Sequence, residues 1–122
     1  MTTVKKVKIL GESWKIVITD DYKKYDLDNS SGYCDHSART CIICNKIDNR
    51  NFEGNNPRAY MKRVARHEIT HAFMFESGLA YDSSEHQGAW AMNEEMIDWF
   101  ARQITKIEKV ALDIDLVIDK MS

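Results

Sequence analysis

The sequence predicts a single α+β domain, in which a small antiparallel sheet is followed by two long helices. Residues 1–56 consist mainly of β-rich runs separated by turn residues, which predicts strands and loops. Residues 57–78 and 89–121 carry apolar side chains at three- and four-residue spacing, which predicts one helix and then a second helix with a helical tail. With 122 residues, the chain can build one modest hydrophobic core.

Two hairpins are expected in the N-terminal part. Val4 to Leu10 and Trp14 to Thr19 flank the segment Gly11-Glu12-Ser13, a three-residue loop that suits a hairpin. A polar loop follows from Asp20 to Gly32. Residues 33–35 and 40–45 then form two further short strands, joined through 36–39, which completes the predicted antiparallel sheet.

The three cysteines lie in the second hairpin. Cys41 and Cys44 have the C-x-x-C spacing of some zinc sites, with Cys34 and His36 nearby. The two isoleucines between them favour an extended strand, in which residues three apart point to opposite faces. The cysteines are therefore predicted to be small strand residues rather than a second zinc site. Residues 41–45 are also a candidate sheet edge for pairing with an extended peptide.

Helix signals are clear at both ends of the first helix. Asn56 is the expected N-cap, Pro57 suits the first turn, and Gly78 is a plausible stop. The second helix is expected to begin between 89 and 93. Beyond residue 107 the apolar stripe continues, but residues 112–116 also alternate as a strand does, so either structure is possible there.

A metal-binding pattern lies in the first predicted helix. Residues 66–71 read Arg-His-Glu-Ile-Thr-His, so His67 and His71 are one helical turn apart, with Glu68 beside the first. Two neutral imidazoles at this spacing can bind one zinc ion, and the glutamate is then placed to act as a general base. All three residues are expected to fall on the apolar, inward-facing arc of the helix. The simpler alternative is that the two histidines are core residues with hydrogen-bond partners. Two histidines and a glutamate together on this arc favour a metal site instead.

A catalytic zinc site usually has a third protein ligand. Glu94 and Asp98 form an i,i+4 pair on a face shared with Ile97, Ala101 and Ile104. Glu94 can ligate the metal, and Asp98 can accept the free ring N–H of His67 or His71. A solvated acidic patch at a helix N-terminus is the alternative, and it explains the neighbouring Glu95 well. His86 is a weaker ligand candidate, and Tyr81 and His86 could each donate to an oxyanion.

The two motifs together resemble those of gluzincins, the thermolysin-like zinc peptidases. The stretch from Glu94 to Ala101 is also similar to the second motif of the compact ImmA/IrrE-type metallopeptidase domains. Residues 66–73 and 76–79 resemble small HExxH proteins of phages and prophages in Gram-positive bacteria. The chain differs from the larger thermolysin-like enzymes in lacking their substrate-binding subdomain and a certain equivalent of their oxyanion-stabilising His or Tyr.

The resemblance implies a minimal zincin fold and a role for each motif residue. His67, His71 and Glu94 would be the Zn²⁺ ligands, Glu68 the catalytic carboxylate, and Asp98 the acceptor behind a ligating histidine. It also implies a protein or peptide substrate.

Composition excludes several other classes. Seventeen basic and 19 acidic residues are mixed along the chain and give a net charge of −2, so no basic block indicates nucleic acid. No apolar run approaches the roughly 18 residues of a membrane span, and the N-terminus lacks a signal-type apolar region. An odd number of cysteines argues against a secreted disulfide framework. These features predict a cytoplasmic protein, in a bacterial host cell if it is encoded by a phage.

Three functions are therefore considered. The favoured one is zinc-dependent hydrolysis of peptide bonds, with Glu68 as the general base. The alternative is a phage-associated protein-binding module that retains a metalloprotease fold with a structural or vestigial zinc site. The third is a structural α+β protein in which the motifs are coincidental.

Overall fold

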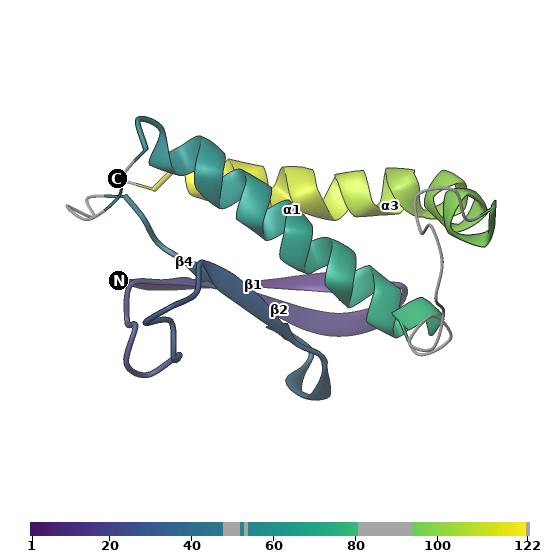
Figure 1. Ribbon diagram of the computed structural model, residues 1–122, viewed down its shortest axis with the longest axis horizontal. Helices are drawn as coiled ribbons and strands as arrows, with labels where there is room; N and C mark the ends of the chain where they lie inside the picture. Colours follow the sequence, from purple (N-terminus) through teal and green to yellow (C-terminus); the bar gives the residue numbers. More distant parts are fainter. Residues whose placement is uncertain (48–51, 53, 81–93, 122) are drawn as a thin grey trace.

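The computed structural model describes residues 1–47, 52, 54–80 and 94–121, apart from the side chains at positions 94, 95, 97, 98 and 101 (Figure 1). In this part of the chain a four-stranded sheet carries two long helices on one face, which confirms the predicted α+β class. None of the helices that the structure describes is long and apolar enough to cross a membrane.

The first hairpin joins β1 (Thr2–Ile9) to β2 (Glu12–Thr19) in antiparallel register. Its turn consists of Leu10 and Gly11, whose φ angles of 50° and 87° are both positive, as a type I′ turn requires. The connection is therefore two residues long, one shorter than the predicted loop. The hairpin itself is confirmed.

The second hairpin joins β3 (Gly32–Asp35) to β4 (Thr40–Cys44), also antiparallel. A short 3₁₀ turn, His36–Ala38, connects them, and the Asp35 carboxylate caps it by accepting hydrogen bonds from the amides of Ser37 and Ala38. This carboxylate has a lowered pKa, chiefly because of its hydrogen bond from the Ser37 hydroxyl.

The order of the strands in the sheet is β1-β2-β4-β3, and β2 pairs with β4 in parallel. The sheet is therefore mixed, and the prediction of a wholly antiparallel sheet was wrong. The segment 20–31 leads from the end of β2 to β3 at the far edge, so β4 returns beside β2 in the same direction as β2. Because β4 lies inside the sheet, the prediction that residues 41–45 form its edge was also wrong; the edge on that side is β3.

Helix α1 spans Pro57–Glu76, close to its predicted bounds. The Asn56 side chain accepts a 3.0 Å hydrogen bond from the amide of Ala59, and Gly78 follows the helix with a φ of 84°, so both end signals are confirmed. Helix α3, Glu94–Asp119, is continuous, which settles residues 112–116 as helical. The predicted start at 89–93 lies outside the described residues.

The main core lies between the sheet and the two helices, and a smaller one lies on the opposite face under the segment 20–31 (Figure 1). Cys41 belongs to the main core and Cys44 to the smaller one, which confirms that their thiols point to opposite faces. The two helices are also joined by ion pairs from Arg66 to Asp115 and from Lys62 to Asp119. Together these contacts fix the orientation of α1 above the sheet.

Candidate metal centre

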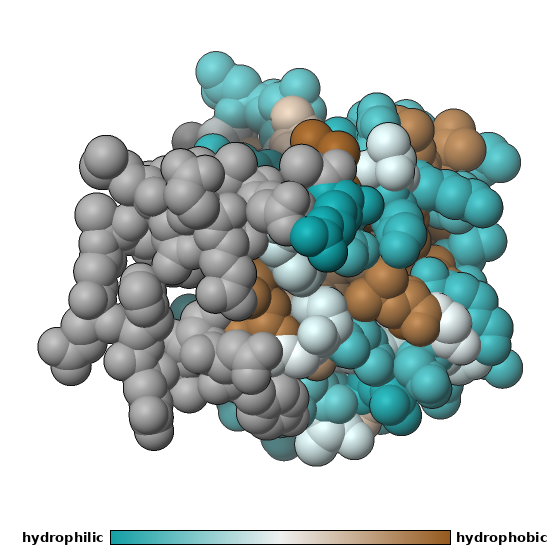
Figure 2. Space-filling model, turned by 90° about the vertical axis from the view of Figure 1, so that its right-hand side faces the viewer, coloured by the Kyte–Doolittle hydropathy of each residue, from teal (hydrophilic) through white to brown (hydrophobic). Residues whose placement is uncertain are grey.

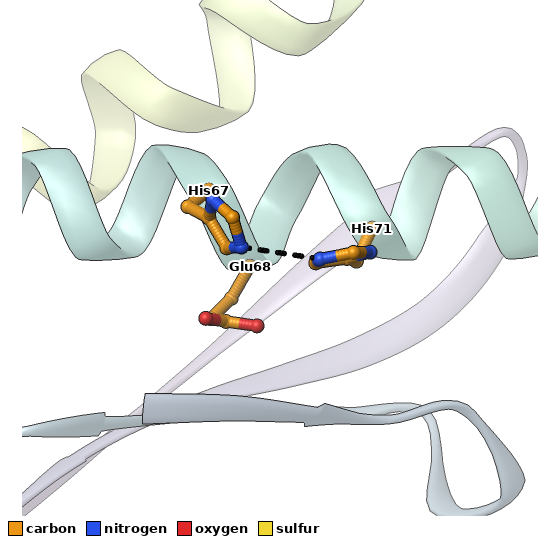
Figure 3. A group of neighbouring side chains, drawn as sticks. All are labelled: His67, Glu68 and His71. Atoms are coloured by element: carbon orange, nitrogen blue, oxygen red, sulfur yellow. Dashed lines mark hydrogen bonds between the residues drawn. The ribbon is translucent and has the colours of Figure 1, made fainter. Parts of the chain in front are cut away.

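The imidazoles of His67 and His71 face each other on the surface of α1 (Figure 3). Their Nε2 atoms are 3.2 Å apart, and their ring planes are inclined by 72°. The two residues are separated by four positions, so one helical turn brings both rings to the same side of the helix. The Nε2 atoms thus point towards each other, within hydrogen-bonding distance when one of them carries a proton.

This separation suits a shared metal ion. Two nitrogens bound to one tetrahedral zinc at about 2.0–2.1 Å would lie about 3.3 Å from each other. The observed 3.2 Å between the Nε2 atoms is close to that value. A ligand atom of Glu68 lies within 4.8 Å of those of both histidines, and among the described residues this is the one group with such an arrangement.

Glu68 differs from the two histidines in its surroundings. It is 7% exposed, and its carboxylate extends from α1 towards the sheet (Figure 3). Burial raises the pKa of this carboxyl, and the nearby His67 and His71 oppose that rise. The group is therefore a better proton acceptor than an exposed glutamate, as a general base at neutral pH should be.

The prediction that all three residues face inward was wrong for the histidines. His67 and His71 are exposed, whereas Glu68, Ile69 and Ala72 are buried. Adjacent helical positions differ by about 100° around the axis, so the buried face of α1 includes Glu68 and leaves the two imidazoles at its rim. Such a position leaves room for a ligand beside the imidazoles.

A cavity of about 390 Å³ lies against the histidines, between α1 and the first part of α3. Its volume is within the range of small-molecule and peptide side-chain pockets. The described residues that line it come from one face of α1 and from Phe100 of α3; those on α1 are Arg66, His67, Thr70, His71 and Met74. The histidine pair is thus accessible from a defined space.

The third predicted ligand is carried by α3. Glu94 is the first residue of that helix, but the side chains of Glu94 and Asp98 lie outside the described ones, so their approach to the histidines stays a prediction. Trp99 donates a 2.9 Å hydrogen bond to the Ser77 hydroxyl, which holds the start of α3 beside the end of α1. Ile104, predicted to share the face of Glu94 and Asp98, is 57% exposed, so that face is not apolar at this position.

The other candidates for this site stay predictions. Tyr81 and His86 lie outside the described residues. His36 is stacked on Phe75, with ring centroids 4.1 Å apart, and is no part of the histidine cluster.

Two residues that support Glu68 were missed by the sequence analysis. A Cβ on Gly32 would lie 2.7 Å from the carbonyl oxygen of Ile42, 2.9 Å from Cγ1 of Val64 and 3.6 Å from Cγ of Glu68, so only glycine lets β3 pass this closely beneath α1. The Cys41 thiol donates a 3.5 Å hydrogen bond to the Glu68 carbonyl. The sequence did contain a signal for Gly32, because a glycine stands directly before a β-rich run. It contained no signal for the contact of Cys41 with Glu68.

Comparison of the chain with family models, curated proteins and solved structures finds no match. The support for a function therefore comes from the residues and the geometry of this chain.

Proposed function

We propose that this protein is a zinc-dependent peptidase that hydrolyses peptide bonds with water, using Glu68 as the general base. The observation that carries the proposal is the 3.2 Å separation of the His67 and His71 Nε2 atoms, with the buried Glu68 carboxylate beside them. The motif resemblance to gluzincins and to small phage HExxH proteins is in accord with it. The proposed place of action is the cytoplasm of a bacterial cell.

The proposed ligands are His67, His71 and Glu94, with Asp98 accepting the free ring N–H of one histidine. Zinc held there would lower the pKa of a water molecule towards about 7 and polarise the substrate carbonyl. Glu68 accepts the proton of the attacking water and then delivers it to the leaving amine, so the same carboxylate serves as base and acid. Burial of Glu68 suits this transfer of a proton because it raises the pKa of the carboxyl group.

The test compares Glu68→Gln and His71→Ala with the wild type, all purified without metal-chelating tags. We expect Glu68→Gln to retain zinc and lose hydrolysis, and His71→Ala to lose both. Zinc content is measured by elemental analysis. Substrates are sought by comparing new protein termini in bacterial extracts treated with wild type or Glu68→Gln. Wild-type zinc affinity in His71→Ala would refute the ligand assignment.

A protein-binding module with a structural zinc is the second candidate, and one observation favours it. Among the described residues that line the cavity, Thr70 donates to the Arg66 carbonyl at 2.7 Å, and one Nη of Arg66 donates to Asp115 at 2.6 Å. The single hydroxyl proton of Thr70 is therefore not free to stabilise an oxyanion, and Arg66 is paired with a carboxylate, which reduces its positive charge towards the cavity. Cleavage that depends on both Glu68 and metal would exclude this candidate, whereas zinc binding without cleavage of any substrate would support it.

A further inference from the structure

A second and larger cavity lies on the other side of α3, away from the histidines. It is a groove of about 600 Å³ between β1 and α3, and Phe73 and Val110 form part of its apolar lining. Neither histidine nor Glu68 is among its lining residues. Figure 2 shows the end of the molecule that carries the β1–β2 turn, where hydrophilic side chains surround patches of hydrophobic surface. The groove, formed by Lys5, Lys6 and Lys8 on β1 together with Lys106, Lys109 and Val110 on α3, is called the lysine groove below.

The lysine groove is strongly cationic although the whole chain is slightly acidic. Among the described residues, five lysines and one acidic residue, Asp113, line it. Lys6 and Lys8 contribute mainly their backbone, because they alternate along β1 with Val7 and Ile9, which face the helices. In the described part of the chain Lys8 donates to the Ser13 hydroxyl at 2.8 Å, and none of the five forms an ion pair. Lys5 alternates in register with Val7 and Ile9, which face the helices, so its side chain lies on the same face of the sheet as Lys106 and Lys109; these three lysines against Asp113 favour an anionic occupant.

One wall of the groove is an open edge of the sheet. Within the described residues β1 pairs with β2 alone. The amide of Lys15, which lies opposite Lys6, donates to the Arg39 carbonyl at 3.0 Å, away from β1. The pair Lys6–Lys15 is therefore a non-hydrogen-bonded pair of the ladder, and by alternation so is Lys8–Ser13. The backbone N–H and C=O groups of Lys6 and Lys8 consequently point outward, where another strand can bind them.

Lysines on an edge strand also have a simpler explanation, since charge there prevents pairing between edges of two molecules. This explains Lys6 and Lys8, because they would face the lysines of a second molecule that paired with β1. It does not explain Lys106 and Lys109, which come from α3 and line the same cavity. Lys5, on the helix-facing side of β1, lies on the same face of the sheet as these two lysines, and protection of an edge does not require that arrangement.

We propose that the lysine groove binds an extended acidic segment of a partner protein, which adds to the sheet as a strand beside β1. Backbone hydrogen bonds to Lys6 and Lys8 supply the pairing, and acidic side chains of the partner meet Lys5, Lys106 and Lys109. The alternate side chains of the partner segment point to the opposite face of the sheet. This surface is separate from the proposed zinc site and does not depend on the peptidase activity.

The first experiment uses a short acetylated peptide in which Val and Glu alternate. We expect it to bind in calorimetry and to shift the amide resonances of Lys6 and Lys8, with weaker binding at higher salt. The same peptide with Gln in place of Glu, or with Pro in place of alternate Val, should bind about tenfold more weakly or not at all. Equal binding of the Gln peptide, or equal or tighter binding of single-stranded DNA or polyphosphate, would overturn the proposal, and so would self-association through β1.

Variants of the protein test the two walls separately. Lys106→Glu with Lys109→Glu should weaken peptide binding by about tenfold or more, whereas the matched reversal Lys23→Glu with Lys24→Glu, at exposed positions outside the groove, should not. On β1, Lys6→Pro removes an outward amide and Lys6→Gln removes the same charge while keeping the amide. Lys6→Pro should bind more weakly than Lys6→Gln, and identical affinities would overturn strand addition. Unchanged amide spectra away from the substituted positions and an unchanged urea midpoint would show that each variant is folded.

Discussion

Nε1 of Trp14 donates a 2.8 Å hydrogen bond to Oε1 of Glu76, which joins strand β2 to the last residue of α1. The same carboxylate oxygen accepts a hydrogen bond from Nε of Arg39, in the connection between β3 and β4. Trp14 is 1% exposed and the Glu76 side chain 13%. Three separate segments therefore meet at the C-terminal end of the helix that carries the histidines, and fix its position on the sheet.

Removing this carboxylate should destabilise the fold. Glu76→Ala leaves the buried indole N–H of Trp14 without its partner, and we expect the free energy of unfolding to fall by about 1–3 kcal/mol. Glu76→Gln keeps an oxygen acceptor for Trp14 and loses the charge, so it should lose less. Urea denaturation measures both. A loss in Glu76→Gln as large as that in Glu76→Ala would show that the charge, and not the indole bond, dominates.

The same contact predicts how stability depends on pH. Burial alone would raise the pKa of Glu76, but the hydrogen bonds from Arg39 and Trp14 and the Arg39 charge together lower it below its usual 4.5. A carboxyl with a lowered folded-state pKa stabilises the protein above its unfolded pKa, and this contribution is lost as the pH falls through the folded pKa. The difference in stability between wild type and Glu76→Gln should therefore shrink below pH 4.5. A difference that stays constant down to pH 2 would contradict this assignment.

Gly32 offers a test of how closely β3 must approach α1. In Gly32→Ala the new methyl group would meet the Ile42 carbonyl and Val64, so we expect a loss of about 1–3 kcal/mol in unfolding free energy. Adding Val64→Ala relieves one of the two contacts. The double variant should therefore be more stable than the sum of the single changes predicts. Strict additivity in urea denaturation would show that Val64 is not the obstacle.

Local signals explain why the helices could be predicted from the sequence. Asn56, Pro57 and Gly78 act within one turn of the helix ends, and the four-residue spacing of His67 and His71 fixes their mutual position on any α-helix. Both predictions depend on neighbours in the chain, and both are confirmed.

Non-local features were predicted less well. The parallel pairing of β2 with β4 depends on where the segment 20–31 carries the chain, and that segment is polar without a regular pattern. Helical spacing gives the angle between His67 and Glu68 but not which of them faces the sheet, so the exposure of the imidazoles was missed. Residues 112–116 fit a helix or a strand; the burial of Ile114 and Ile118 in the main core agrees with the helix.

Cys41 should be chemically inert in the folded protein. It lies directly opposite Cys34 across the hairpin, and its thiol is fully buried. Its hydrogen bond with Cys34 and its burial raise the pKa of the thiol far above its ordinary value. We expect iodoacetamide at pH 8 to modify Cys41 only after unfolding, as measured by mass spectrometry of peptides. Rapid modification in the native state, or release of zinc on alkylation, would contradict the structural role assigned to this cysteine.

Glu94 provides the sharpest test of the metal centre, because Glu95 is a matched control at the adjacent position of the same helix end. If Glu94 is the third ligand, Glu94→Ala should weaken zinc binding by more than the roughly 10–100-fold expected when a partner of a ligating histidine is lost. Asp98→Asn should fall within that smaller range, and Glu95→Ala should leave the affinity unchanged. Competition with a chromogenic chelator measures all three. Equal effects of Glu94→Ala and Glu95→Ala would mean that the acidic residues only favour the N-terminus of α3, and the ligand set would then have to be completed by another residue.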